Sequence, residues 1–64
     1  MFMTDFWDRM NTQFGESYAQ SLAKDYVFAK LGERTIERAL AEGEDARTVW
    51  HAVCETFPVP ERLR

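Results

Sequence analysis

The residues best suited to chemistry lie near the two ends of the chain. His51, Cys54 and Glu55 fall within five positions of one another, and Asp5 and Asp8 lie one helical turn apart. A cysteine can act as a nucleophile or a redox sensor, a histidine as a base or a metal ligand, and neighbouring carboxylates are typical of acid–base chemistry. A nucleophilic cysteine must be exposed and have a lowered pKa. Cys54 falls on an apolar stripe, which predicts a buried, inert thiol.

The charged candidates have structural interpretations that account for them fully. Asp5 and Asp8 fall in the first turn of a predicted helix, where the helix dipole favours negative charge. His51 precedes Glu55 by four residues, a spacing typical of an ion pair on a helix surface. A metal site needs three or four clustered ligands, and the chain has one histidine and one cysteine. We therefore expect no catalytic residue, no metal, no cofactor and no enzymatic activity.

A second pattern is similar to a DNA-reading motif. Ala39, Gly43 and Val49 have the spacing of the small residue, turn glycine and apolar residue of helix-turn-helix proteins. Glu44, however, falls where that motif buries an aliphatic side chain. The pattern therefore also fits two helices that simply pack together, and we favour this interpretation.

The charge of the chain bears on the same choice. The helix that would read DNA presents Arg47, Thr48 and His51 together with acidic residues. Phosphate contacts supply most non-specific DNA affinity, whereas this chain has 8 basic and 11 acidic residues and a net charge of -3. We therefore expect the protein to be a protein-interaction or regulatory module. The alternative is DNA binding through these three residues, with a link to recombination or repair.

The elements that position these residues are predicted from apolar periodicity and capping residues. The chain is expected to form one all-α domain over residues 1–64, a compact bundle of four short helices with an extended, proline-containing tail. The predicted helices cover about 5–14, 18–31, 36–42 and 46–57, and the tail covers 58–64. The predicted N-terminal caps are Thr4, Ser17, Thr35 and Asp45.

The predicted core depends on apolar stripes in the first and last helices. These stripes carry Trp7 and Trp50, and 45% of all residues are hydrophobic. A chain of this length buries only roughly 60% of the surface that its unfolded form exposes. Association with a partner protein or with itself is therefore expected to add stability.

The candidate interaction surface lies at the end of the second predicted helix and on the tail. Phe28 and Leu31 fall off the main apolar face of that helix, so partial exposure is expected. Arg62, Leu63 and Arg64 add a flexible, basic segment. In the alternative interpretation, the tail folds back over Phe28 and completes the core.

The N-terminal segment and the single cysteine indicate the compartment. The first eight residues include acidic residues and lack the basic start of a signal peptide, and no apolar run approaches the ~20 residues of a membrane span. A secreted domain of this size normally carries several cysteines. We expect a cytoplasmic protein that does not enter the membrane.

The order of motifs along the chain resembles a known family. The residues that carry the resemblance are Thr4-Asp5-Phe6-Trp7, Arg9-Met10, Phe14-Gly15, Tyr18-Ala19, Ser21, Ala23-Lys24-Asp25, Arg34-Thr35, Ala39-Leu40, Gly43, Asp45 and Val49-Trp50-His51-Ala52-Val53-Cys54. They are similar to those of short actinobacterial proteins catalogued as domain of unknown function 3046. The resemblance covers nearly the whole chain and implies a compact, all-helical cytoplasmic protein. It also implies a genomic setting near regulators of recombination and DNA repair, but it brings no activity and no functional residues.

Overall fold

Four α-helices and two single-turn 3-10 helices make up the regular structure of the chain. The computed structural model describes residues 1–64. In chain order the helices are α1 (Met3–Phe14), α2 (Glu16–Asp25), η1 (Ala29–Leu31), α3 (Ile36–Ala41), α4 (Ala46–Thr56) and η2 (Glu61–Leu63). The predicted all-α class is confirmed.

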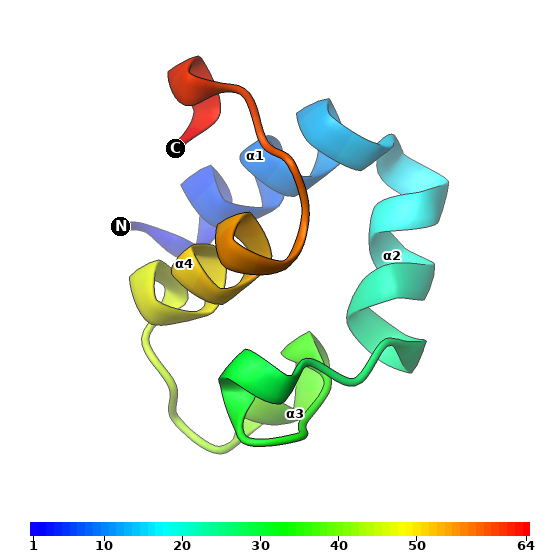
Figure 1. Cartoon of the computed structure of the whole chain (residues 1–64), viewed down its shortest axis with the longest axis vertical. Helices are drawn as coiled ribbons and strands as arrows, with labels where there is room; N and C mark the ends of the chain where they lie inside the picture. The colour runs from blue at the N-terminus through cyan, green and yellow to red at the C-terminus, as the bar shows by residue number, and fades with distance from the viewer.

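The α-helices are arranged as a ring of neighbours (Figure 1). α1 packs against α2 and α4, and α3 packs against the same two helices from the other end. η1 lies against α4, and the two chain ends lie on the same side of the molecule. The resulting body measures 26 × 22 × 20 Å, and all four α-helices contribute residues to its single hydrophobic core.

A single glycine joins α1 to α2. Gly15 has a φ of 86°, a conformation that L side chains rarely adopt, and its N–H donates to the Asn11 carbonyl at 2.8 Å. Its own carbonyl accepts the N–H of Ala19, so the residue that ends α1 also starts α2. α2 therefore begins at Glu16. The predicted cap at Ser17 is wrong, because Ser17 already lies inside the helix.

α1 also begins earlier than predicted. Its N-cap position is Phe2, whose carbonyl accepts the N–H of Phe6 at 3.1 Å, and no side chain caps this end. Thr4 is thus a helical residue, and its predicted capping role is wrong. The helix gains its first turn from backbone hydrogen bonds and from the packing of its apolar face.

α2 ends six residues before the predicted boundary. The chain becomes extended at Tyr26, and Phe28 forms an isolated antiparallel bridge with Arg34, whose carbonyl accepts the Phe28 N–H at 2.9 Å. Tyr26, Val27 and Phe28 are consecutive residues of types that favour extended backbone. The extended path brings the Phe28 ring into the core, which a continuous helix would not do.

α3 and α4 have the predicted order and nearly the predicted bounds. The Thr35 hydroxyl accepts the N–H of Arg38 at 3.1 Å and caps α3, as predicted. Gly43, with a φ of 95°, lies in the turn between the helices. Asp45 occupies the N-cap position of α4, but its side chain makes no capping hydrogen bond.

Every fully buried side chain in the core is hydrophobic. Phe6 and Trp50 meet edge to face with their ring centroids 6.1 Å apart, and Trp7, which is only partly buried, contacts Phe6 at 5.1 Å. Ala52 is 4% exposed, because α1, α3 and η1 all pack against α4. The two tryptophans therefore share one core, with Trp50 as its buried member.

The tail folds back onto the body. It is extended from Phe57 to Pro60 and then turns through η2. Val59 is buried, and the Pro58 carbonyl accepts a hydrogen bond from the Gln13 side chain at 3.3 Å. The tail thus lies against α1 and α4 and forms part of a surface groove.

Candidate functional site

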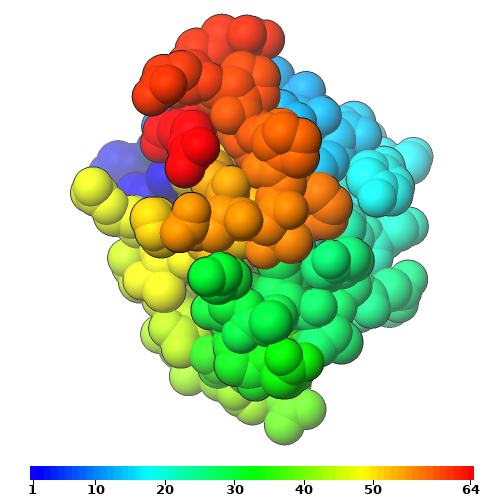
Figure 2. Space-filling model, in the orientation of Figure 1, coloured from blue at the N-terminus to red at the C-terminus, as the bar shows by residue number.

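An open groove of about 920 Å³ lies beside the outer face of α4. Its floor is formed by α4, one wall by the start of α1 and the chain's C-terminal end, and further lining by η1. In the space-filling view the blue N-terminal segment shows between the yellow start of α4 and the red C-terminal end (Figure 2). Three separate parts of the chain therefore meet here.

The floor of the groove carries the polar side chains of α4. Arg47, Thr48 and His51 are exposed because the opposite face of the helix, with Val49 and Val53, is fully buried. The amphipathic spacing predicts this division. His51 Nε2 lies 3.9 Å from a carboxylate oxygen of Glu55, the ion-pair spacing expected from the sequence. All three residues of the DNA-facing set therefore lie on one surface.

The wall of the groove is formed by one stripe of α1 and by the tail. Asp5 and Arg9 lie one helical turn apart on this stripe. Arg9 Nη1 donates to the Leu63 carbonyl at 3.2 Å and approaches the Arg64 carbonyl at 3.4 Å. The Trp50 indole donates to the same Leu63 carbonyl at 2.9 Å. The Leu63 carbonyl therefore joins the tail to both helices.

The charges of the groove are the reverse of those of the whole protein. The lining contains four of the chain's eight basic residues and two of its eleven acidic residues. The charged lining residues are Arg9, Lys30, Arg47 and Arg64 on the basic side and Asp5 and Glu55 on the acidic side. None of the four cations forms an ion pair with an Asp or Glu side chain. Their charge is therefore available to a ligand.

Cys54 borders the groove as a nearly buried thiol. It is 8% exposed, and burial raises its pKa, although the positive charges of Arg64 and Arg9 oppose this rise. A raised pKa keeps the thiol protonated at neutral pH, which disfavours nucleophilic attack. The prediction of a buried thiol is confirmed. No group of three metal-ligating side chains comes together anywhere in the structure.

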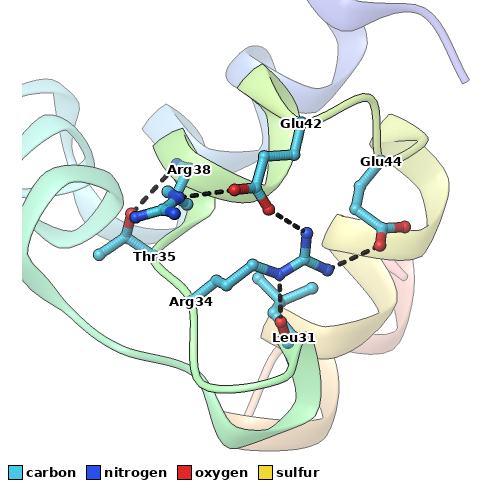
Figure 3. A network of polar contacts seen from close by, with 6 residues as sticks. All are labelled: Leu31, Arg34, Thr35, Arg38, Glu42 and Glu44. Carbon is cyan, nitrogen blue, oxygen red and sulfur yellow. Dashed lines mark hydrogen bonds and ion pairs between the residues drawn. The ribbon is translucent and has the colours of Figure 1, made fainter.

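A second cluster of polar side chains connects the two ends of α3 to each other and to η1 (Figure 3). Arg34 Nε donates to the Leu31 carbonyl at 2.7 Å, and its two Nη atoms contact Glu42 at 2.8 Å and Glu44 at 2.6 Å. Arg38 binds the other oxygen of Glu42 at 2.7 Å. Both carboxylates of the cluster are thus paired with arginines of the same cluster. We therefore assign this cluster a structural role.

The cluster changes the protonation equilibria of its members. Hydrogen bonds to Glu44 and Glu42 raise the pKa of Arg34, and hydrogen bonds from Arg38 and Arg34 lower the pKa of Glu42. Glu44 occupies the position where a helix-turn-helix motif buries an aliphatic residue. Here it is partly exposed and bound to Arg34, so the turn before α4 is held by charge pairing.

The expected exposure of Phe28 and Leu31 is wrong. Phe28 is 0% and Leu31 3% exposed. The early end of α2 turns Phe28 inward, where its ring lies 4.7 Å from Tyr26 and 6.0 Å from Phe57. Both side chains therefore belong to the core of this structure and not to its exposed surface. The tail folds back onto the body, where the Leu63 carbonyl accepts from Arg9 and Trp50, and the rings of Tyr26 and Phe57 lie beside Phe28.

The remaining tail residues lie in three different settings. Arg64 lines the groove, Leu63 packs partly buried against the core, and Arg62 is exposed outside the groove. The structure therefore joins Arg64 to the predicted α4 set. It also adds Arg9 and Lys30, which sequence reasoning missed. Neither residue carries a local signal for this position, because both reach the groove only when α1 and η1 pack against α4.

These features define a class: a small, compact, all-helical protein with a basic surface groove. None of its helices has the length and apolar character needed to cross a membrane. The chain belongs to the family described as "Protein of unknown function (DUF3046)", whose model matches residues 1–62. The resemblance predicted from the motifs is thereby confirmed. No curated protein and no solved structure matches the chain.

Proposed function

We propose that this protein is a protein-interaction module that captures an acidic segment of a partner protein in the groove. The observation that carries the proposal is the concentration of unpaired cations there. Arg9, Lys30, Arg47 and Arg64 line one groove in a protein whose net charge is -3. Clustered charge of one sign steers oppositely charged partners and determines which partner is accepted.

The proposal describes binding, not catalysis. The single thiol is nearly buried with a raised pKa, and His51 faces Glu55 instead of a nucleophile. The groove supplies positive charge, a hydroxyl from Thr48 and some apolar surface from Met1. These groups suit carboxylates on a peptide. The lone cysteine supports placing this interaction in the reducing cytoplasm.

DNA binding is the second candidate and is supported by Arg47, Thr48 and His51 on one face of α4. Two observations weigh against it. α3 is only six residues long, and the face of α4 forms the floor of a groove beside α1 and the tail. A recognition helix must enter the major groove of DNA, which requires a protruding helix. We therefore rank an acidic protein segment above DNA.

Fluorescence anisotropy with three labelled ligands tests the proposal. The ligands are an Asp/Glu-rich peptide of about 12 residues, its Asn/Gln isostere and a short DNA duplex. We expect binding of the acidic peptide only, with affinity that falls as salt rises from about 50 to 300 mM, because salt screens exposed charges. Tight binding of the duplex would favour the alternative, and equal binding of both peptides would contradict the proposal.

Charge-reversal variants locate the binding surface. Lys30→Glu and Arg47→Glu alter exposed groove cations, whereas Lys24→Glu and Arg62→Glu make the same charge change at exposed sites outside the groove. We expect each groove variant to weaken peptide binding by about fivefold or more and each control by less than about twofold. Equal losses in all four variants would indicate a non-specific charge effect. Sedimentation velocity on the free protein distinguishes partner binding from self-association.

A further inference from the structure

Arg9 lines the groove and also forms hydrogen bonds that hold the C-terminal tail. Its Nη1 donates to the Leu63 carbonyl at 3.2 Å and lies 3.4 Å from the main-chain oxygen of Arg64. The other arginines of the groove, Arg47 and Arg64, make no side-chain hydrogen bond. Arg9 is therefore the one groove cation whose position the fold fixes.

The unused donors of Arg9 are suited to a carboxylate. A guanidinium has five N–H donors in a planar fork, and only those of Nη1 are engaged here. The edge formed by Nε and Nη2 makes no hydrogen bond within the protein. Asp5, one turn earlier on α1, does not pair with Arg9. A carboxylate can bind such an edge through two parallel hydrogen bonds.

We propose that Arg9 is the specificity-determining residue of the groove and binds an Asp or Glu carboxylate of the partner segment through its Nε–Nη2 edge. The Leu63 carbonyl positions the guanidinium for this contact. This inference rests on the proposed function and names the anchor of its ligand. A ligand on the free edge restrains the guanidinium, so occupation of the groove also fastens the tail.

The shared acceptor explains the connection between ligand and tail. A carbonyl oxygen has two lone pairs, and that of Leu63 accepts from both Arg9 and the Trp50 indole. The Leu63 and Arg64 amides donate to the Pro60 and Glu61 carbonyls at 2.9 and 3.1 Å. Exchange of these two amides with solvent therefore reports whether η2 is formed and docked.

The experiment compares two identical substitutions at different groove arginines. Arg9→Lys and Arg47→Lys both keep the positive charge, but lysine lacks the planar fork. We expect Arg9→Lys to weaken binding of the Asp/Glu-rich peptide by about fivefold and Arg47→Lys by less than about twofold. Thermal melts and amide spectra of both variants serve as the control that they are folded.

NMR supplies a readout that depends on the tail. In the parent protein, saturating peptide should slow exchange of the Leu63 and Arg64 amides and shift the Trp50 indole resonance. In Arg9→Lys these responses should be lost or strongly reduced. Trp50→Phe removes the second donor to the Leu63 carbonyl while keeping an aromatic ring, so it should weaken peptide binding by a smaller factor, about twofold.

The results distinguish failure of the role of Arg9, of the positioning by Leu63 and of the proposed function. Equal losses in Arg9→Lys and Arg47→Lys, with binding to the parent intact, would overturn the role of Arg9 and leave the proposed function standing. Peptide binding without any change in tail exchange would overturn the positioning by Leu63. Failure of the parent to bind the acidic peptide would overturn the proposed function and this inference together.

Discussion

Replacing Phe28 tests the structure at the place where it departs most from the sequence pattern. Phe28 follows the early end of α2, its side chain is fully buried, and its ring contacts those of Tyr26 and Phe57. The predicted helix over 18–31 would place the same residue at the surface. The substitution Phe28→Ala therefore separates a core residue from a surface residue by the size of the stability loss.

The expected loss is a large part of the total stability. Truncation of a buried phenylalanine to alanine costs about 3–5 kcal/mol, because apolar burial is lost and a cavity remains. At roughly 0.05–0.15 kcal/mol per residue, a chain of this length has a free energy of unfolding of about 3–10 kcal/mol. A loss at the low end lowers the melting temperature by at least about 12 °C.

Circular dichroism measures the effect during heating and during urea unfolding. Val27→Ala is the matched control, because Val27 is the preceding residue and is 52% exposed. Surface substitutions of this kind usually change stability by no more than about 0.5 kcal/mol. A Phe28→Ala protein that melted within a few degrees of the parent would refute the burial argument and restore Phe28 as a surface candidate.

Two further predictions concern titratable groups. Cys54 is nearly buried and burial raises its pKa, so it should react with a thiol reagent only after denaturant is added. Cys54→Ala should leave peptide binding unchanged. Rapid labelling of the native protein would contradict the prediction of a buried thiol. Arg38 and Arg34 lower the pKa of Glu42 below its ordinary 4.5, so its stabilising effect is present above that pH and is lost as pH falls through the lowered value. Melting temperatures of the parent and Glu42→Gln should therefore converge on acidification, and a constant difference down to about pH 2 would show that Glu42 does not act through its charge.

The helices were predictable where periodicity and capping agree. α4 carries a regular apolar stripe, and Thr35 caps α3 with the expected hydrogen bond. The boundary of α2 was missed because no proline or glycine ends the helix near Asp25. The sequence does contain a signal, because Val27 and Phe28 fall off the apolar face of the predicted helix. Apolar residues off that face can indicate either an exposed apolar surface or, as here, the end of the helix.

The site was only partly predictable for a different reason. Arg47, Thr48 and His51 share one face of α4, which helical spacing shows directly. Arg9 and Lys30 reach the groove only after α1 and η1 pack against α4, so their neighbourhood depends on tertiary structure. The charge balance of the whole sequence likewise conceals the local excess of cations, because acidic residues dominate the rest of the surface.

The meeting of both chain ends at the groove affects how the protein can be studied. Met1 and Arg64 both line it, and the two ends lie on the same side of the molecule (Figure 1). Anything attached at either end, such as a purification tag or a fluorophore, emerges beside the groove and competes with a ligand or blocks it. The same arrangement offers a tool, because an acidic peptide fused through a short flexible linker would face the groove at an effective concentration in the millimolar range. A weak interaction could thereby be captured within a single polypeptide.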